Sequence, residues 1–241
     1  MNLSIPKNPL RLSTGVFTDH ELDYFDTLGP DYFPSEETQK VSESDAHYLS
    51  IKLAFELLER VFPEPSDVYI AANHFIYWDR RQKGLVLGPD LYVAKGVGRR
   101  RRDSYKVWEE GGQVPNVVFE FASDETWKKD LREKKDYYER DLTIPEYFLF
   151  DPVGGRYPRK LQGFRLEGGT YRPIPLTDDR LYSEQLDLNL VSDGIYLRFF
   201  DPHKGALVPS PAEDLEARTR MEAENARLRA ELEALRRNVQ P

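Results

Sequence analysis

The first regular pattern of apolar positions lies between residues 45 and 62. Its large apolar members recur at spacings of four, three and four, and they are Ile51, Phe55, Leu58 and Phe62. This spacing places their side chains on one face of a helix. Residues 42–45 precede the pattern with the spacing of a capping box, and Pro63 follows it. The pattern therefore predicts an amphipathic helix that ends before Pro63.

Runs rich in β-branched and aromatic residues come next along the chain. They predict strands at residues 68–78, 85–94 and 117–121. A polar helix is expected at residues 126–139, followed by a short strand at residues 147–150. Because a strand, a helix and a strand in succession usually join parallel strands by a right-handed crossover, we predict an α/β (α+β) fold with a mixed central sheet flanked by helices.

The ends of this core are defined by changes in the pattern. Residues 163–171 alternate around Gly168-Gly169, which predicts a hairpin, and residues 182–200 predict one or two further strands. Residues 1–40 contain several prolines and glycines without sustained periodicity, so we expect an arm on the surface. Residues 41–205 are then expected to form one domain with a C-terminal β extension.

The tail at residues 211–239 has a different rhythm. Apolar and amide residues alternate spacings of four and three, and they are Met221, Asn225, Leu228, Leu232, Leu235 and Val239. This heptad pattern predicts a coiled-coil helix with Asn225 at an a position, and a parallel homodimer formed through residues 212–239. The alternatives are a short solvated helix, since three heptads are marginal alone, and pairing with another protein.

Composition narrows the candidate chemistry. Hydrophobic residues make up 39% of the 241 positions and charged residues 32%, which is typical of a globular chain. No apolar run is long enough to cross a membrane, and the first nine residues lack a secretory pattern, so we expect a cytoplasmic protein. Cysteine is absent, which excludes disulfides, thiolate zinc sites and a cysteine nucleophile. Any metal is therefore expected to be Mg²⁺ or Mn²⁺ on carboxylates.

Two acids lie in apolar strand runs. Glu120 lies within residues 117–122, where burying a carboxylate costs several kcal/mol unless a cation or hydrogen bonds offset its desolvation. Asp90 follows Pro89, which marks an edge, a bulge or a strand beginning. Together the two acids predict a metal site. The alternative is that each acid is satisfied separately by an arginine or by backbone donors.

A cation for these acids is expected on the helix that follows. Its most apolar face consists of Trp127, Leu131, Lys134 and Tyr138. Lys134 therefore points toward the core, where it needs a nearby anion. Asp130 precedes it by four residues, which suits a helical ion pair. The alternative is that Lys134 extends outward along an apolar stem and pairs with Asp130 alone.

These features resemble a known nuclease superfamily. Pro89-Asp90, Glu120 in an apolar strand and an inward lysine resemble the PD-(D/E)xK nucleases. Residues 41–200 are similar to the bacterial Uma-two family of restriction-endonuclease-like proteins. The passages that carry this resemblance are residues 88–97, residues 117–123 with Asp130, Lys134 and Tyr138, and residues 144–152. The resemblance implies a restriction-endonuclease-like core.

The sequence departs from the superfamily pattern at one position. The common lysine stands two residues after the glutamate, where this chain has Ala122. The resemblance implies that the lysine has moved to the following helix, as Lys134, with Lys135 and Lys129 as substitutes. It also implies an accessory acid from the first helix, for which Glu43 and Glu56 are the candidates. His47 and His74 belong to no motif, and we expect them to be structural or surface residues.

We therefore expect a DNA endonuclease in which Asp90 and Glu120 bind Mg²⁺ or Mn²⁺ and Lys134 assists, with Asp130 as an accessory acid. The arginine run is expected to contact the phosphate backbone or to form a solvated loop, and it consists of Arg99, Arg100, Arg101 and Arg102. One alternative is a catalytically silent module that binds protein or nucleic acid. Another is a metal-free glycosidase, which the inward lysine fits poorly.

Overall fold

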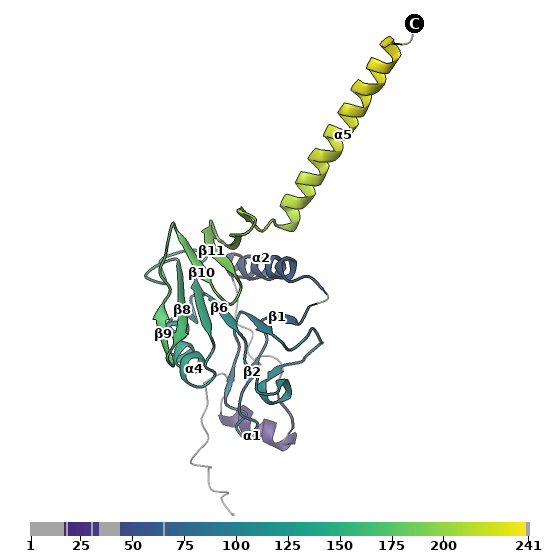
Figure 1. The fold of residues 1–241 in the computed structure, drawn as a ribbon. Coiled ribbons are helices and arrows are strands. Elements are labelled where there is room, and N and C mark those ends of the chain that lie inside the picture. Colours follow the sequence, from purple (N-terminus) through teal and green to yellow (C-terminus); the bar gives the residue numbers. More distant parts are fainter. Residues whose placement is uncertain (1–16, 18, 30, 34–43, 65, 240–241) are drawn as a thin grey trace, which may run out of the picture.

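The computed structural model describes residues 17, 19–29, 31–33, 44–64 and 66–239. Figure 1 shows a body of sheets and helices from which one long C-terminal helix projects. No helix in this described part combines the length and the apolar character that crossing a membrane requires. The helical elements are α1 (Asp19–Thr27), α2 (Asp45–Val61), η1 (Val107–Glu110), α3 (Trp127–Lys129), η2 (Asp130–Lys134), α4 (Lys135–Arg140) and α5 (Pro211–Val239).

A mixed sheet forms the centre of the body. Its strands, in spatial order, are β1 (Val68–Ala72), β4 (Leu91–Lys95), β6 (Val117–Phe121), β7 (Glu146–Phe150), β8 (Leu161–Glu167) and β9 (Thr170–Pro173). β6 and β7 are parallel, whereas the other neighbouring strands are antiparallel. The connection from β6 to β7 contains α3, η2 and α4. The predicted mixed sheet with a helical crossover is therefore confirmed, as is the hairpin at Gly168-Gly169.

Two smaller sheets flank the central one. The first has the order β3 (Val86–Leu87), β2 (Ile76–Tyr77) and β5 (Tyr105–Lys106). The second has the order β10 (Arg180–Ser183), β11 (Leu188–Asp193), β12 (Tyr196–Asp201) and β13 (Ala206–Leu207). Three strands of this second sheet overlap residues 182–200, where one or two were predicted, because tight turns such as the one at Gly194 (φ 57°) reverse the chain.

The two faces of the central sheet carry different layers. In β6, Val117, Phe119 and Phe121 point toward a core shared with α2 and the β10–β12 strands. Val118 points to the opposite face, into a core shared with Tyr138 of α4. Because side chains alternate along a strand, Glu120 lies on the same face as Val118. The sheet therefore presents Glu120 to the helical segment that follows it in sequence.

Two predicted strands are interrupted in the structure. The run at residues 68–78 splits into β1 and β2 at Asn73, whose φ of 48° is left-handed. The run at residues 85–94 splits into β3 and β4 at residues 88–90. Pro89 has no amide hydrogen to offer a sheet, which explains the second break. Asp90 consequently lies immediately before β4 rather than inside a strand.

The expected N-terminal arm contains a helix that its sequence did not predict. α1 buries Leu22 completely, and Phe17 just before it packs edge-on against Phe75, with ring centroids 5.6 Å apart. Residues 1–16 and 34–43 lie outside the described residues, and the predicted accessory acid Glu43 is among them. The described part of the arm is therefore docked to the body through apolar contacts.

The close approach of β7 and β8 depends on Gly163. Gly163 pairs with Phe148, and a Cβ added at Gly163 would lie 2.6 Å from the Phe148 ring. That ring is fully buried and stacks on Phe119, so it cannot shift freely. We expect Gly163→Ala to lower the free energy of unfolding by about 1–3 kcal/mol in urea denaturation. Gln162→Ala on the same strand is the control, and equal midpoints for the two variants would contradict this prediction.

Candidate active site

Asp90 lies immediately before β4, and Glu120 lies on the neighbouring strand β6. The antiparallel register pairs Leu91 with Phe119, so Asp90 lies opposite Glu120 one step beyond that pair. The Asp90 carboxylate accepts a hydrogen bond from the backbone amide of Phe121 through Oδ2, at 2.6 Å. This bond replaces a strand–strand hydrogen bond at the point where β4 begins. The two carboxylates are thus held close together by sheet geometry rather than by flexible loops.

The Glu120 carboxylate is completely buried and both of its oxygens accept hydrogen bonds. Lys134 Nζ donates to Oε2 at 2.9 Å, and the Tyr138 hydroxyl donates to Oε1 at 2.8 Å. Burial raises the pKa of Glu120 well above its usual range, and the charges of Asp130 and Asp90 raise it further, while Lys134 acts in the opposite direction. The helical segment therefore supplies the cation that this carboxylate requires.

Lys134 bridges two buried acids. Its Nζ lies 3.0 Å from Oδ1 of Asp130, in an ion pair without the alignment of a hydrogen bond. The other oxygen of Asp130 accepts hydrogen bonds from the hydroxyls of Tyr157, at 3.1 Å, and Thr126, at 3.3 Å. Burial would lower the pKa of Lys134, but the surrounding carboxylates raise it above its usual value. Lys134 therefore points inward, between two acids that favour its charged form.

A π-helical turn sets the direction of these side chains. The sequence predicts a continuous α-helix, but residues Asp130–Lys134 form a π-turn between α3 and α4. The wider turn brings Asp130, Lys134 and Tyr138 to the sheet, with Asp130 and Tyr138 fully buried, whereas Trp127 and Leu131 are only partly buried. Asp130 is therefore part of the cluster, and not merely a helical partner of Lys134.

Neither of the other two candidate lysines joins the cluster. Lys135 lies over the ring of Phe164, with Nζ 4.4 Å from the centroid, and Lys129 is exposed to solvent. The structure thus brings Lys134, and not its sequence neighbours, to Glu120.

His47 lies beside Asp90, although it belongs to no sequence motif. Ser44 caps α2 by accepting a hydrogen bond from the His47 amide, which places the imidazole at the start of the helix. His47 Nε2 lies 3.0 Å from the Phe121 carbonyl oxygen and 3.5 Å from Asp90 Oδ2. The other first-helix candidate, Glu56, is partly exposed and lies 4.0 Å from Lys52. The sequence offered one indication of this role for His47, which is its position in the first turn of the predicted helix.

The two principal acids differ in electrostatics. Burial acts to raise the pKa of Asp90, but His47, the charge of Lys134 and the Phe121 amide together lower it. The pKa of Glu120, by contrast, is raised mainly by burial. Asp90 is therefore the acid that is ionised more readily, and its side chain is 15% exposed whereas that of Glu120 is fully buried.

The donor set determines which metal the cluster could hold. Among the residues described, no three His, Cys, Asp or Glu side chains are arranged to bind a metal ion together. The Phe121 amide and His47 both approach Asp90 through Oδ2, which leaves Oδ1 as the oxygen for a further ligand. Mg²⁺ often binds to one or two carboxylates and completes its shell with water and substrate phosphate. Asp90 fits such a sparse site through Oδ1, whereas Glu120, both of whose oxygens accept hydrogen bonds from Lys134 and Tyr138, could join it only by exchanging one of these donors for the ion.

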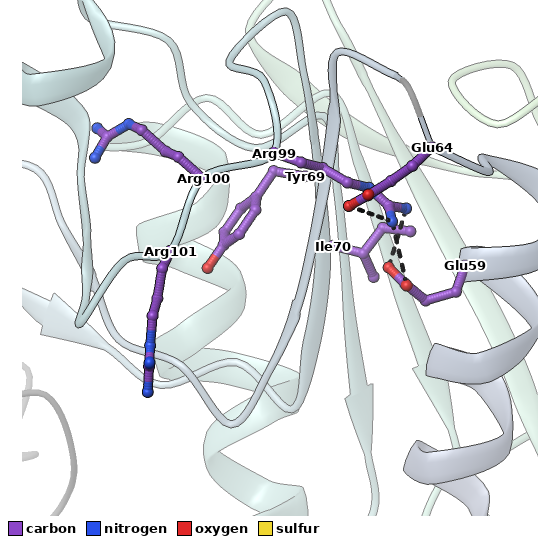
Figure 2. A pocket seen from close by; sticks show the side chains of 7 residues that line it. All are labelled: Glu59, Glu64, Tyr69, Ile70, Arg99, Arg100 and Arg101. Atoms are coloured by element: carbon purple, nitrogen blue, oxygen red, sulfur yellow. Dashed lines mark hydrogen bonds and ion pairs between the residues drawn. The ribbon is translucent and has the colours of Figure 1, made fainter.

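The arginine run does not lie beside these acids. Figure 2 shows that Arg99 points toward Glu59 and Glu64, whereas Arg100 and Arg101 point away from them. Arg99 donates to the backbone oxygens of Val68 and Phe62, so it is tied to the start of β1. Asp90 is tied instead to the end of β1, because its carbonyl accepts from the Asn73 amide. The run therefore begins at the opposite end of that strand from Asp90.

Arg102 is not available for a nucleic-acid contact in this structure. Its side chain is 1% exposed, pairs with Glu110 at 2.8 Å and stacks 4.2 Å from the centroid of the Tyr69 ring. Arg100 also pairs with Glu110, whereas Arg101 is exposed. The run, expected either to contact phosphate or to form a solvated loop, is divided in this structure, because Arg99 and Arg102 fasten the loop and Arg100 and Arg101 reach solvent.

Tyr157 also enters the cluster from a segment that gave no motif. It follows β7 in a loop organised by Asp151, which is buried and accepts hydrogen bonds from the amides of Gly154 at 2.8 Å and Arg156 at 2.7 Å. The Tyr157 hydroxyl then reaches Asp130. The loop after β7 consequently helps to fix Asp130 and, through it, Lys134.

Comparison with known proteins gives this geometry a family context. Residues 36–194 match the sequence profile Uma2, described as a putative restriction endonuclease. Among solved structures, the chain is similar to a putative nuclease belonging to DUF820 from Anabaena variabilis ATCC 29413, with 12% sequence identity and a TM-score of 0.48. That alignment covers 68% of this chain and 89% of the other. No curated protein matches the sequence.

Proposed function

The chain belongs to the Uma2 family, as its motifs predict, and on that premise we propose that it is a Mg²⁺- or Mn²⁺-dependent endonuclease that hydrolyses DNA phosphodiester bonds. The observation that carries the proposal is the contact of Lys134 Nζ with Glu120 Oε2 at 2.9 Å, one strand away from Asp90. Two acids where β4 begins beside β6, together with an inward lysine, supply the residue types that metal-assisted phosphodiester hydrolysis uses.

Each residue has a chemical role in this proposal. Asp90 and Glu120 would hold the ion, which when bound lowers the pKa of a water molecule and neutralises charge on the phosphate. Lys134, whose ammonium group lies 2.9 Å from Glu120 and whose pKa the surrounding carboxylates raise, would orient the attacking water and stabilise the negative charge that develops on the phosphoryl oxygens. His47 and Asp130 position Asp90 and Lys134 through the contacts described above.

Substrate and assembly belong to the same proposal. DNA is the substrate class that the family description supports. Arg100 and Arg101 are the accessible members of the arginine run, and they are proposed to contact phosphate away from the acids. Cutting both strands of a duplex usually requires two active sites, and we therefore propose that the protein acts as a homodimer.

The first test concerns Asp90. We expect the wild-type chain to nick plasmid DNA with Mg²⁺ or Mn²⁺ and not with EDTA, and Asp90→Asn to weaken Mg²⁺ binding by more than about tenfold in calorimetry. The substituted side-chain amide retains an oxygen that can accept from the Phe121 amide, so the fold should persist. Asp141→Asn, at an exposed position after α4, is the matched control. Equal Mg²⁺ affinity in Asp90→Asn and wild type would exclude Asp90 as a ligand.

A second candidate function, that of a catalytically silent binding module, is supported by the way protein donors occupy the buried acids. Both oxygens of Glu120 are engaged by protein donors, and Glu120 and Asp130 are fully buried, as expected for an ionic network that only stabilises the fold. Such a protein would be a catalytically silent module that acts through binding. Absence of Mg²⁺ and Mn²⁺ binding at neutral pH, in a chain that is fully folded, would favour this function over cleavage.

A further inference from the structure

The helix α5 leaves the body and exposes large apolar side chains. Figure 1 shows that it projects away from the sheets with only its first turn beside them. Its five large apolar side chains in the described part are between 44% and 66% exposed, and they are Leu215, Met221, Leu228, Leu232 and Leu235. Four of them lie on one stripe of a helix that is otherwise charged, and an exposed apolar stripe of this kind is typical of an interaction surface.

The base of α5 is fixed to the body by polar contacts. Ser210 and Glu213 form a reciprocal capping box, in which the Ser210 hydroxyl accepts from the Glu213 amide and Glu213 accepts from the Ser210 amide. Glu213 also pairs with Arg198 of β12 at 2.8 Å, and Asp214 pairs with Arg60 of α2. The direction of the helix is therefore set by the body, and the exposed stripe is held out in a defined orientation.

The stripe follows a heptad repeat. The d positions are Met221, Leu228 and Leu235, and the a positions are Asn225, Leu232 and Val239. We propose that this part of α5 forms a parallel, in-register two-stranded coiled coil with α5 of a second copy of the chain. Asn225 then meets its own counterpart in the core, where such a pair costs stability but fixes the register and favours two strands.

Flanking charges select the parallel orientation. With Asn225 at position a, Glu224 occupies a g position and Arg229 the following e position, and Glu231 repeats the g charge one heptad later, followed by Arg236 at e. In a parallel pair, each g glutamate faces the e arginine of the other helix. In an antiparallel pair, g faces g and e faces e, so glutamate would face glutamate and arginine would face arginine. The sequence of charges therefore opposes antiparallel pairing.

The orientation has a structural consequence for the whole protein. Because both helices would start at the same end, and because each base is fixed to its own body, the two bodies would lie together at that end. If the proposed nuclease function holds, this pairing places two active sites in one assembly, as cleavage of a duplex requires. The pairing itself rests on α5 alone and does not depend on that function.

The first experiment measures association of the full chain by sedimentation equilibrium. We expect a wild-type dimer that dissociates on dilution, and at least about 100-fold weaker association in the double variant Leu228→Asp with Leu232→Asp, because four leucines leave the interface. Leu215→Asp changes a leucine of the same helix that is more exposed than Leu228 and Leu232 and lies outside the stripe, and it should leave association unchanged. A monomeric wild type, or a double variant as dimeric as the control, would overturn the proposal.

The second experiment tests the orientation and exploits the absence of cysteine. Leu235→Cys places one thiol at a core position far from the middle of the stripe, so only a parallel, in-register pair brings the two copies of it together. We expect rapid oxidation of this variant to a covalent dimer, and slow oxidation of Ala230→Cys, which lies on the outer face. Equal rates would overturn the parallel arrangement. Neither experiment involves DNA cleavage, so its result stands even if the nuclease proposal fails.

A charge exchange provides an independent check of the register. Glu224→Arg should weaken the dimer on the order of tenfold, because an attractive contact with Arg229 of the second copy becomes repulsive on both sides of the pair. Adding Arg229→Glu to the same chain should restore association. Failure of the second change to restore it would contradict the contact between positions 224 and 229.

Discussion

Replacing Lys134 with methionine is expected to lower the free energy of unfolding by about 3–5 kcal/mol and to reduce DNA cleavage at least about 100-fold. Methionine fills a similar volume but leaves Glu120 and Asp130 buried without the ammonium group that lies 2.9 Å and 3.0 Å from them. The stability loss is measured by urea denaturation in EDTA. Cleavage is measured by plasmid nicking at saturating Mg²⁺, at a temperature where the variant is folded.

Mg²⁺ distinguishes the two functions in this variant. If Asp90 and Glu120 bind a divalent ion, Mg²⁺ should recover part of the lost stability, because a ligand that binds the folded state stabilises it. A purely structural ion network would gain nothing from Mg²⁺. Lys129→Met is the control, since Lys129 is exposed on the same helical segment and should change stability by less than about 0.5 kcal/mol. Full cleavage by a folded Lys134→Met protein would exclude the assigned role.

The central fold could be predicted because its strands are unusually apolar. The periodicities of β6, of α2 and of the crossover helical segment were each strong enough to define an element, and together they imply the parallel pair. The break between β3 and β4 was signalled by Pro89, whereas the break at Asn73 was not, because the left-handed φ of Asn73 is visible only in the folded chain. α1 was missed because a nine-residue helix docked by Leu22 has too few positions to show a period.

The candidate site was predictable to the extent that buried charge is costly. Glu120 stood out because an acid in a fully apolar strand requires a cation, and Lys134 stood out because it lies on the inward face of the next helix. The burial of Asp130 in the cluster could not be predicted, because the π-turn changes which residues of the helical segment face the sheet. His47 and Tyr157 reach the cluster from segments distant in sequence, and no spacing rule connects such residues.

The arginine run shows why a charge cluster in sequence is a weak guide to a binding surface. In this loop, Arg99 points toward Glu59 and Glu64 whereas Arg100 and Arg101 point away from them, so the run does not form one surface (Figure 2). Here Arg99 is used to fasten the loop to β1 and α2, and Arg102 is enclosed by Glu110 and Tyr69. Glu59 lies 40 residues from Arg99 and Glu110 lies 8 residues from Arg102, and neither pairing follows from the order of charges in the run.

Glu120→Gln is expected to separate chemistry from stability more clearly than any change at Lys134. Glutamine can preserve the packing, because its oxygen accepts from Lys134 while its amide nitrogen donates to the Tyr138 hydroxyl, which can act as donor or acceptor. Burial raises the pKa of Glu120, which means that the folded protein disfavours a negative charge at this position. Removing that charge should therefore cost little stability. We therefore expect the free energy of unfolding to change by less than about 1.5 kcal/mol.

Cleavage by Glu120→Gln should nevertheless fall on the order of 100- to 1,000-fold, because a neutral amide is a poor Mg²⁺ ligand and no longer balances the charge beside the phosphate. Urea denaturation and plasmid nicking on the same preparation give both quantities, with Glu133→Gln on the exposed side of η2 as the control. Loss of cleavage with retained stability is a pattern that a structural ion network cannot produce, since such a network has no activity to lose. Cleavage at the wild-type rate in a folded Glu120→Gln protein would remove Glu120 from the active site and, with it, the reason for placing the metal between these two strands.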